Sequence, residues 1–178
     1  RDIDFVVFAT LSPDYFFPGG GVFVQEKLGL DTVGALDVRD QCTGFIYGLS
    51  VAEAYVKGGF YDHVLVIGAE VQSTGINLST EGRDMAVLFG DGAGAAVVGP
   101  CEAGLGILSS HLHSEGKHAK ELMAEAPSSI EHPRVSREML DAGRQWPRMN
   151  GRFVFVNAVR RFPEAIGEAL SANGLSIG

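Results

Sequence analysis

The chain has 178 residues, of which 46% are hydrophobic and 20% are charged, a balance typical of a globular protein with one sizeable core. Its formal net charge of -8 argues against a nucleic-acid surface, because phosphate binding needs a clustered excess of lysine and arginine. No apolar run is long enough to cross a bilayer, so we expect no membrane partner.

The first expected elements are a strand, a short helix and a second strand. Residues 3–10 form a β-rich apolar run that ends in a turn signal at Ser12 and Pro13, which indicates a buried strand. A run of three glycines opens a small-residue stretch, and we expect a helix over 19–29. The second strand is expected over 35–38.

A longer amphipathic helix is expected to follow and to run to Lys57. Apolar residues recur on one face at helical spacing, and two glycines end the pattern: Phe45, Leu49, Ala52 and Val56, then Gly58-Gly59. Residues 64–69 are apolar and indicate another strand, so strand, helix and strand form a βαβ unit with parallel pairing. The predicted fold class is α/β, in layers.

Glycines punctuate the middle of the chain. We expect adjacent strands over 86–89 and 93–98, around a tight turn at Gly90-Asp91-Gly92. The stretch from Gly90 to Ala95 also satisfies the loose dinucleotide pattern G-x-G-x-x-A. The residues after it are strand-like and would not present helix N–H groups to a pyrophosphate, so we do not expect NAD or FAD here.

The last part of the chain holds one expected strand and one expected helix. The strand covers 106–113, and the segment 114–145 is polar, contains proline and is expected to be irregular in part. The helix covers 153–172 and is ended by Asn173-Gly174.

Cys42 is the candidate nucleophile. It lies where the strand over 35–38 gives way to the long helix, and unpaired N–H groups and the macrodipole at a helix N-terminus favour a thiolate. Small residues follow it, so a ligand or another backbone could approach closely. The alternative is a buried structural cysteine, the usual role of a free cysteine. Cys101 has no comparable setting and is interpreted as structural or incidental.

The histidines offer weaker candidates. His111 and His113 leave the same face of the expected strand, with His118 close behind. No carboxylate or cysteine falls at a supporting spacing, so we prefer a surface or lining role to a zinc site. His63 lies at the far end of the long helix, roughly 24 Å from the candidate nucleophile, which is too far for a base. His132 precedes a proline and is interpreted as a loop residue.

Several motifs, in the same order along the chain, resemble a known family. They are Leu36-Asp37-Val38 with Cys42-Thr43-Gly44-Phe45, the runs 64–70 and 88–95, Ser110-His111-Leu112-His113-Ser114, and Met149-Asn150-Gly151-Arg152 with Val154-Phe155. Together they resemble β-ketoacyl-ACP synthase III, a condensing enzyme of the thiolase superfamily, over nearly the whole chain. Several motifs that occur together in the same order as in the family are far more specific than any single motif.

The resemblance implies a thiolase-like α/β fold, a layered αβαβα molecule with mostly parallel mixed sheets, which is incomplete in this chain. We expect residues 1–100 to be the later part of the fold's N-terminal half, which carries the nucleophile. Residues 101–178 are expected to be the start of the C-terminal half, which is truncated. The implied activity is an acyltransferase reaction that initiates fatty acid biosynthesis. An acyl group passes from coenzyme A to the cysteine and condenses with malonyl-ACP, with loss of carbon dioxide.

Two site residues of the family match the first half of the chain. Cys42 matches the nucleophile. Phe17 matches the residue that reaches across a homodimer into the partner's acyl pocket. Gln41 departs from the family, which usually has Ala before the nucleophile, and this bears on the acyl preference.

Further site residues match the second half. Arg83 matches an arginine of the coenzyme A entrance. Leu88, Gly151 and Phe155 match the lining of the pantetheine tunnel, and Arg152 takes a position that is often Asn. No metal site is implied.

The resemblance implies no tightly bound cofactor, because coenzyme A thioesters and phosphopantetheine are substrates. The implied partners are acyl carrier protein, acyl-CoA and a second copy in a homodimer, with no nucleic acid. Val156 stands where many members have Lys, which bears on the carrier-protein contact. With two cysteines at unrelated spacings and nothing resembling a signal peptide, we expect a cytoplasmic protein.

The family's Pro-His-Gln-Ala-Asn and Gly-Asn segments would follow Gly178, so we expect that the 178 residues alone do not decarboxylate malonyl-ACP. Three alternatives stay open. A related synthase that acts on acyl-CoA or polyketide intermediates would share the motifs. A catalytically incomplete, dimerising fragment would accept no acyl group. A cysteine hydrolase would need a local histidine partner, and none is evident in the sequence.

Overall fold

The structure is a computed structural model that describes residues 2–177. Its packing divides the chain into two compact units. Unit 1 consists of Arg1–Val71 and Asp91–Ser110, and unit 2 of Gln72–Gly90 and His111–Gly178. These units follow contacts within this chain. They do not test the expected boundary between the two halves of the family's fold, after residue 100, which stays a prediction.

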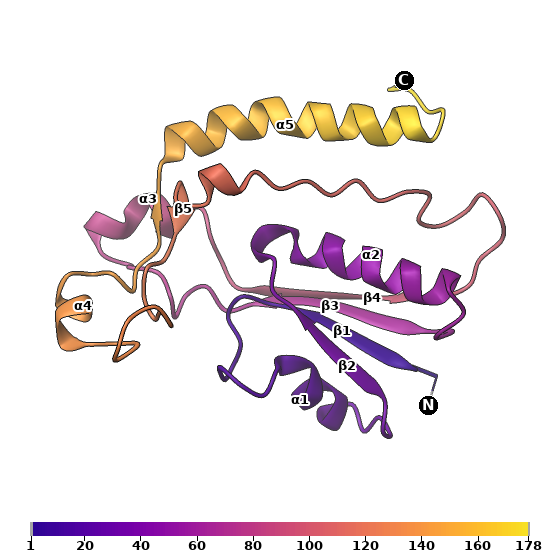
Figure 1. Cartoon of the computed structure of the whole chain (residues 1–178), viewed down its shortest axis with the longest axis horizontal. Helices are drawn as coiled ribbons and strands as arrows, with labels where there is room; N and C mark the ends of the chain where they lie inside the picture. The colour runs from indigo at the N-terminus through magenta and orange to yellow at the C-terminus, as the bar shows by residue number, and fades with distance from the viewer. Residues whose placement is uncertain (1, 178) are drawn as a thin grey trace. The chain divides into compact units, whose positions relative to one another are not determined.

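Unit 1 contains a four-stranded sheet. Figure 1 shows helices on both faces of this sheet. The elements of unit 1 are β1 (Phe5–Ala9), α1 (Gly20–Lys27), β2 (Gly34–Val38), the 3-10 turn η1 (Gln41–Thr43), α2 (Gly44–Lys57), β3 (Val64–Glu70) and β4 (Gly92–Val98). The strand order is β2-β1-β3-β4. β1 is parallel to both β2 and β3, and β4 is antiparallel to β3. The predicted βαβ unit is confirmed, with β1 between its two strands.

The alternation of side chains along β1 explains how two helices cover one sheet. Successive residues of a strand point to opposite faces. A Cβ on Gly48 of α2 would lie 3.3 Å from Val7, whereas a Cβ on Gly20 of α1 would meet the ring of Phe8. Val7 therefore faces α2 and Phe8 faces α1.

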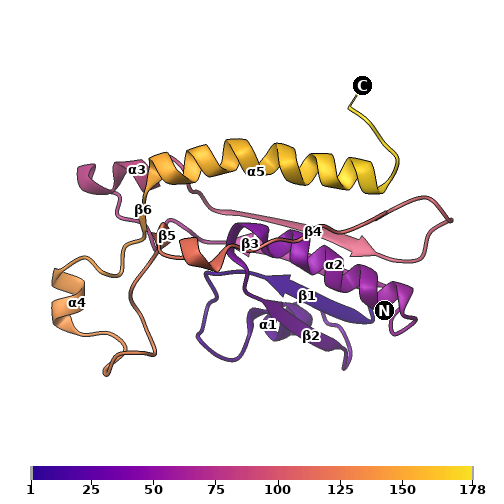
Figure 2. The same ribbon diagram turned by 45° about the horizontal axis from the view of Figure 1, so that its top comes forward.

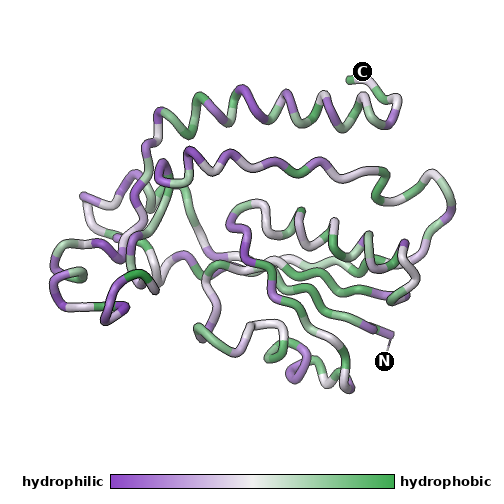
Figure 3. Tube along the Cα trace, viewed as in Figure 1, coloured by the Kyte–Doolittle hydropathy of each residue, from purple (hydrophilic) through white to green (hydrophobic). Residues whose placement is uncertain are grey.

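The core of unit 1 lies between the sheet and α2. Val6, Val7, Val64 and Val66 are fully buried, as expected for parallel strands covered on both faces. β1 and the first half of β3 stand out as hydrophobic stretches in Figure 3. The predicted apolar face of α2 is confirmed, because Ala52 is buried in this core and the other members pack against it, namely Phe45, Leu49 and Val56.

An aspartate on β2 holds the start of α1. Asp37 accepts the N–H groups of Gly20 and Gly21, at 2.6 and 2.9 Å. These are two of the first N–H groups of the helix, which have no partner within it. A carboxylate at this end also interacts favourably with the helix dipole.

We predict that Asp37→Ala lowers the free energy of unfolding by about 1–2 kcal/mol, because two helix N–H groups lose a charged acceptor. Chemical denaturation checks this. Asp31→Ala, at an exposed position between α1 and β2, is the control for the change in charge. Equal unfolding free energies for the two variants would contradict the assignment.

Unit 2 holds short elements and one long helix. They are η2 (Thr80–Gly82), α3 (Arg83–Ala86), η3 (Gly116–His118), β5 (Leu122–Met123), α4 (Arg137–Asp141), β6 (Arg148–Met149) and α5 (Gly151–Ala172). β5 pairs antiparallel with β6, which leads directly into α5 (Figure 2). The predicted helix over 153–172 is confirmed. It begins at Gly151 because the Asn150 side chain caps it, accepting the N–H of Phe153. Among residues 2–177, no helix is both long and apolar enough to span a membrane.

The strand expected over 86–89 is wrong. Ala86 ends α3, and the chain continues in a helical turn in which Val87 N–H donates to the Arg83 carbonyl and Phe89 N–H to the Met85 carbonyl. An apolar run of four residues has no period that separates strand from helix. The buried side chain of Met85 anchors the turn. The expected strand over 93–98 is confirmed as β4, but its partner is β3.

The strand expected over 106–113 is also wrong. Alternation predicts a strand only where a neighbouring strand can complete its hydrogen bonds. In the described part of the chain the only sheets are the four-stranded sheet β2-β1-β3-β4 and the pair β5-β6, and this segment belongs to neither. The irregular segment 114–145 is as expected, apart from the short elements η3, β5 and α4.

Candidate active site

Cys42 lies in η1, two residues after the end of β2, and η1 leads directly into α2. This is the predicted junction of strand and helix. Its side chain is exposed in this chain, whereas a structural cysteine is usually buried. Cys101 is exposed as well, and its thiol donates to the Leu105 carbonyl at 3.3 Å.

The turn that carries Cys42 has an unusual backbone. Gln41 has a φ of 40°, in the left-handed region that residues other than glycine rarely adopt. Thr43 holds the turn closed, because its N–H donates to the Asp40 carbonyl and its hydroxyl donates to the Asp40 carboxylate at 2.7 Å. Such strained residues persist where the surroundings hold them, often at functional sites.

Glycines bring α2 down onto the sheet beside this turn. A Cβ on Gly44 would lie 3.2 Å from the Cβ of Ala9, and a Cβ on Gly48 would lie 3.0 Å from Val66. The small residues after Cys42 therefore serve the close approach of helix to sheet. Cys42 therefore lies near the C-terminal ends of the parallel strands β1 and β2.

Phe17 lies in the loop between β1 and α1, also in unit 1. Its side chain is 82% exposed, so nothing in this unit buries it. Tyr15 and Phe16 beside it are exposed at 61% and 65%. The family resemblance indicated Phe17 alone, although the run of three aromatic residues is visible in the sequence.

The remaining candidates belong to unit 2. Arg83 begins α3 and Leu88 follows it, whereas Gly151 and Arg152 begin α5 and Phe155 lies one turn further on. All five residues are exposed. They fall in two short segments of the chain, residues 83–88 and residues 151–155.

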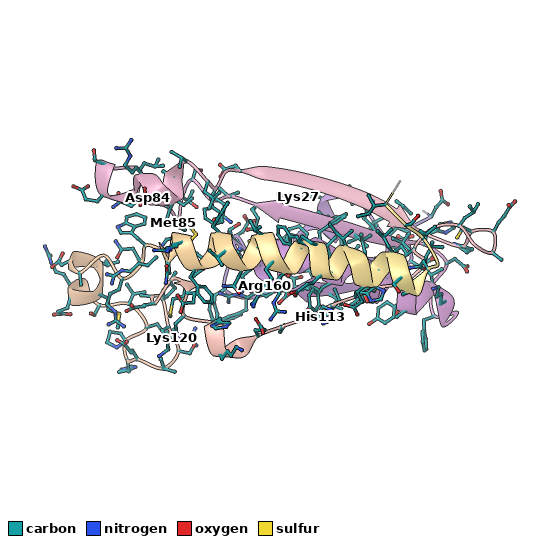
Figure 4. The ribbon with its side chains drawn as sticks, turned by 90° about the horizontal axis from the view of Figure 1, so that it is seen from above. Lys27, Asp84, Met85, His113, Lys120 and Arg160 are labelled. Atoms are coloured by element: carbon teal, nitrogen blue, oxygen red, sulfur yellow. The ribbon has the colours of Figure 1, made fainter. Side chains whose placement is uncertain are left out.

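A cavity of about 350 Å³ lies within unit 2, lined by residues of the stretches 77–85 and 142–149, and none of the five candidates lines it. Asp84 and Met85, the two residues after Arg83, contribute to its wall and lie together on α3 (Figure 4). Met149 lines it as well, two residues before Gly151. Trp146, the chain's only tryptophan, is another lining residue, and no motif in the sequence indicated a role for it.

The histidine pair has a carboxylate partner that sequence spacing did not indicate. His111 Nδ1 lies 3.0 Å from one oxygen of Glu168, and His113 Nε2 lies 2.7 Å from the other. Figure 4 shows His113 alongside α5, the helix that carries Glu168. Glu168 lies more than fifty residues from either histidine in the sequence, so the spacing of residues around the pair gave no sign of this contact. Within residues 2–177, no three His, Cys, Asp or Glu side chains are arranged to hold a metal ion.

These contacts predict a pH dependence. Hydrogen bonds from His111 and then His113 hold the pKa of Glu168 below its ordinary value of 4.5. A lowered folded-state pKa stabilises the fold above the unfolded-state pKa, and this contribution is lost as the pH falls through the lowered value. We predict that Glu168→Gln unfolds at lower denaturant concentration than wild type at about pH 6, and that this difference disappears near pH 3.

Denaturation curves at both pH values check this, with the exposed Glu102→Gln as control. A difference between wild type and Glu168→Gln that is the same at both pH values would contradict it.

The fold is that of thiolase-like condensing enzymes. The crystal structure of a β-ketoacyl-[acyl carrier protein] synthase III from Thermus thermophilus superposes with a TM-score of 0.85 at 39% identity, over 98% of this chain and 52% of that one. The priming β-ketosynthase of the R1128 polyketide pathway superposes with a TM-score of 0.78 at 31% identity, over 98% of this chain and 50% of that one.

The sequence comparisons identify the family. Residues 36–116 match the model of the family described as 3-oxoacyl-[acyl-carrier-protein (ACP)] synthase III. The β-ketoacyl-[acyl-carrier-protein] synthase III of Caldanaerobacter subterraneus subsp. tengcongensis is 42% identical over 176 residues, which are 99% of this chain and 52% of the relative. The chain belongs to the β-ketoacyl-ACP synthase III family and spans about half the length of the curated relatives it matches.

Proposed function

We propose that Cys42 accepts an acyl group from a coenzyme A thioester, and that the whole protein condenses this group with malonyl-ACP to initiate fatty acid biosynthesis. One observation carries the proposal. An exposed cysteine stands in a strained turn at the junction of strand and helix, in a chain of the synthase III family.

The proposed chemistry has two steps. In the first, the Cys42 thiolate attacks the thioester carbonyl, the new carbon–sulfur bond forms, and coenzyme A leaves as a thiolate. In the second, loss of carbon dioxide from the malonyl group leaves a carbanion that attacks the Cys42 thioester and releases the cysteine. The product is a 3-ketoacyl thioester on the carrier protein.

The backbone at Cys42 favours the first step. The N–H groups of Thr43 and Gly44 donate to the carbonyls of Asp40 and Gln41, which fixes the turn. We assign the N–H of Cys42 itself to the oxyanion that forms during attack. One such preorganised donor contributes about 3–4 kcal/mol to transition-state stabilisation.

The substrate contacts are assigned to unit 2. Arg83 and Arg152 are exposed cations suited to the phosphates of coenzyme A. Leu88, Gly151 and Phe155 are assigned to the pantetheine tunnel, and their exposure leaves them accessible to a substrate. In this proposal no cofactor is tightly bound, since coenzyme A and phosphopantetheine are consumed as substrates.

A homodimer belongs to the same proposal. β2 lies at the edge of the sheet, where one side of its backbone is available to a second copy. Phe17 is exposed and could then enter the partner's acyl pocket. We further propose that the protein works in the cytoplasm, with acyl carrier protein as its second macromolecular partner.

An assay of the full-length protein tests the proposed reaction. Labelled acetyl-CoA is supplied with malonyl-ACP or malonyl-CoA, and the 3-ketoacyl product is measured. The proposal expects product with malonyl-ACP and release of carbon dioxide in equal amount. Product with malonyl-CoA alone would overturn the assignment to fatty acid initiation.

A related polyketide-type synthase is the second candidate. It is favoured by Gln41, which replaces the Ala usual in the family before the nucleophile, and by the likeness to the R1128 priming enzyme. Comparing acyl-CoA substrates of increasing chain length separates the two candidates. A preference for long or unusual primers over acetyl-CoA supports the second.

A further inference from the structure

Asn150, the residue before α5, is held by Glu121 at two points. Its N–H donates to the carbonyl of Glu121 at 2.8 Å, and its amide Nδ2 donates to the Glu121 carboxylate at 2.9 Å. These bonds continue the pairing of β5 with β6, in which Leu122 lies opposite Met149. One glutamate therefore fixes both the backbone and the side chain of the residue that leads into α5.

The bond to Glu121 determines which way the Asn150 amide points. An asparagine amide has a donating nitrogen and an accepting oxygen. Because the nitrogen faces the carboxylate, the oxygen is left to accept the N–H of Phe153, at 3.3 Å. This is one of the first N–H groups of α5, which have no partner within the helix. Glu121 therefore acts through Asn150 on the first turn of α5.

The chain just before Glu121 contacts α5 at two further points. The centroid of the His118 ring lies 4.6 Å from that of Phe153, in the first turn of the helix. Arg161, about two turns further along, donates to the Glu115 carboxylate at 2.6 Å. Both contacts use other side chains, so removal of the Glu121 carboxylate leaves two attachments of the helix in place. The loss is expected to be confined to the cap.

The first turn of α5 carries residues that are assigned above to the substrate. Gly151 and Arg152 begin the helix, and Phe155 follows one turn on. Arg152 is exposed, so its place depends on the backbone of the helix start more than on packing around its side chain. A helix end that loses its cap frays, because its first N–H groups then bond to water. A frayed start holds Gly151 and Arg152 less firmly.

We propose that Glu121 is a positioning residue for coenzyme A, because it orients the Asn150 cap that holds the substrate-binding start of α5. This inference rests on the proposed function, in which Arg152 binds a phosphate and Gly151 lines the pantetheine tunnel. Glu121 itself touches neither the substrate nor a reacting group. Its loss weakens the binding of coenzyme A thioesters and leaves the chemistry at Cys42 unchanged.

The experiment measures acylation of Cys42 in the full-length protein with two acyl donors. Acetyl-CoA carries the phosphates and the pantetheine, whereas S-acetyl-N-acetylcysteamine presents the same thioester without the phosphates and most of the pantetheine. Glu121→Ala removes the carboxylate, and Glu121→Gln keeps an oxygen that can accept the Asn150 amide N–H. The control is Asn173→Ala at the other end of α5, where the Asn173 side chain donates to the Ala169 carbonyl at 2.7 Å.

Glu121→Ala is expected to raise the KM for acetyl-CoA about 5-fold, the factor by which the loss of an N-cap shifts the balance between an ordered and a frayed helix end. Its kcat should stay within about 2-fold of wild type, since a change confined to KM indicates lost binding. Its kcat/KM for S-acetyl-N-acetylcysteamine should equal that of wild type. Glu121→Gln should restore most of the KM, and Asn173→Ala should leave both donors unaffected.

Asn150→Ala removes the cap itself and tests the inference a second way. It should raise the KM for acetyl-CoA at least as much as Glu121→Ala does. Adding Glu121→Ala to this variant should change the KM little further, because both substitutions act through the same cap. Independent, additive effects of the two substitutions would overturn the inference.

The two acyl donors separate the other outcomes. A wild-type KM for acetyl-CoA in folded Glu121→Ala overturns the inference and leaves the proposed function standing. So does an equal loss with both donors, or an equal rise in KM in Asn173→Ala, because either result indicates a general loosening of α5. If Cys42 of folded wild type takes no acyl group from either donor, the proposed function falls and this inference falls with it.

Discussion

Cys42→Ala is expected to lower acyl transfer from acetyl-CoA by at least about 10³-fold, because no other group at this edge of the sheet is assigned to form the thioester. The exposed Sγ at the start of α2 is the atom that accepts the acyl group in the proposed mechanism. Alanine keeps the backbone turn and removes only that atom. Transfer rates measured with labelled acetyl-CoA check the prediction.

Cys101→Ala is the matched control for this variant. Both cysteines are exposed, but Cys101 lies in a loop after β4 and donates its thiol to the Leu105 carbonyl. The control should transfer acetyl groups at the wild-type rate. A Cys42→Ala protein that is folded and keeps a tenth or more of the wild-type rate would contradict the role assigned to Cys42.

Gly48→Leu is expected to lower the free energy of unfolding by about 3 kcal/mol, at the upper end of the effect of overpacking a core. Gly48 faces the sheet, where even a Cβ would lie 3.0 Å from Val66 and 3.3 Å from Val7. A leucine there must push α2 away from β1 and β3. Because α2 begins beside Cys42, acyl transfer should fall as well.

Gly167→Ala is the control, in which a glycine is replaced at a position with free space around it. Gly167 lies within α5, and a Cβ there would meet nothing within 4 Å. Alanine favours the helix over glycine by about 1 kcal/mol, so this variant should be as stable as wild type or more stable. Thermal and chemical denaturation measure both variants. A Gly48→Leu protein with wild-type stability would contradict the close contact between α2 and the sheet.

The elements that sequence reasoning predicted correctly are those with a strong repeating pattern. The apolar face of α2, with Ala52 at its centre, and the continuous apolar run of β3 both indicate one structure only. The two wrong strands, over 86–89 and 106–113, show the limit of such patterns. The first run is too short to have a period, and the second lacks a strand to pair with in the described chain.

The candidate site was predictable in part for a similar reason. A cysteine between a strand and a helix is a local signal, and Cys42 lies where that signal indicates. Two features depend on tertiary contact between segments far apart in sequence and have no local signal. These are the hydrogen bonds of Glu70 with Leu11 and Ser12, and those of Glu168 with the two histidines. The left-handed backbone of Gln41 is also invisible in sequence, because it is imposed by the turn around it.

Peptide mapping by mass spectrometry tests the central claim most directly. The full-length protein is incubated with acetyl-CoA alone, digested, and searched for an acetyl group on each cysteine. We predict one thioester-linked acetyl group on the peptide that contains Cys42, and none on the peptide that contains Cys101. A folded protein with no acetyl group on Cys42, or with equal amounts on both cysteines, would contradict the account.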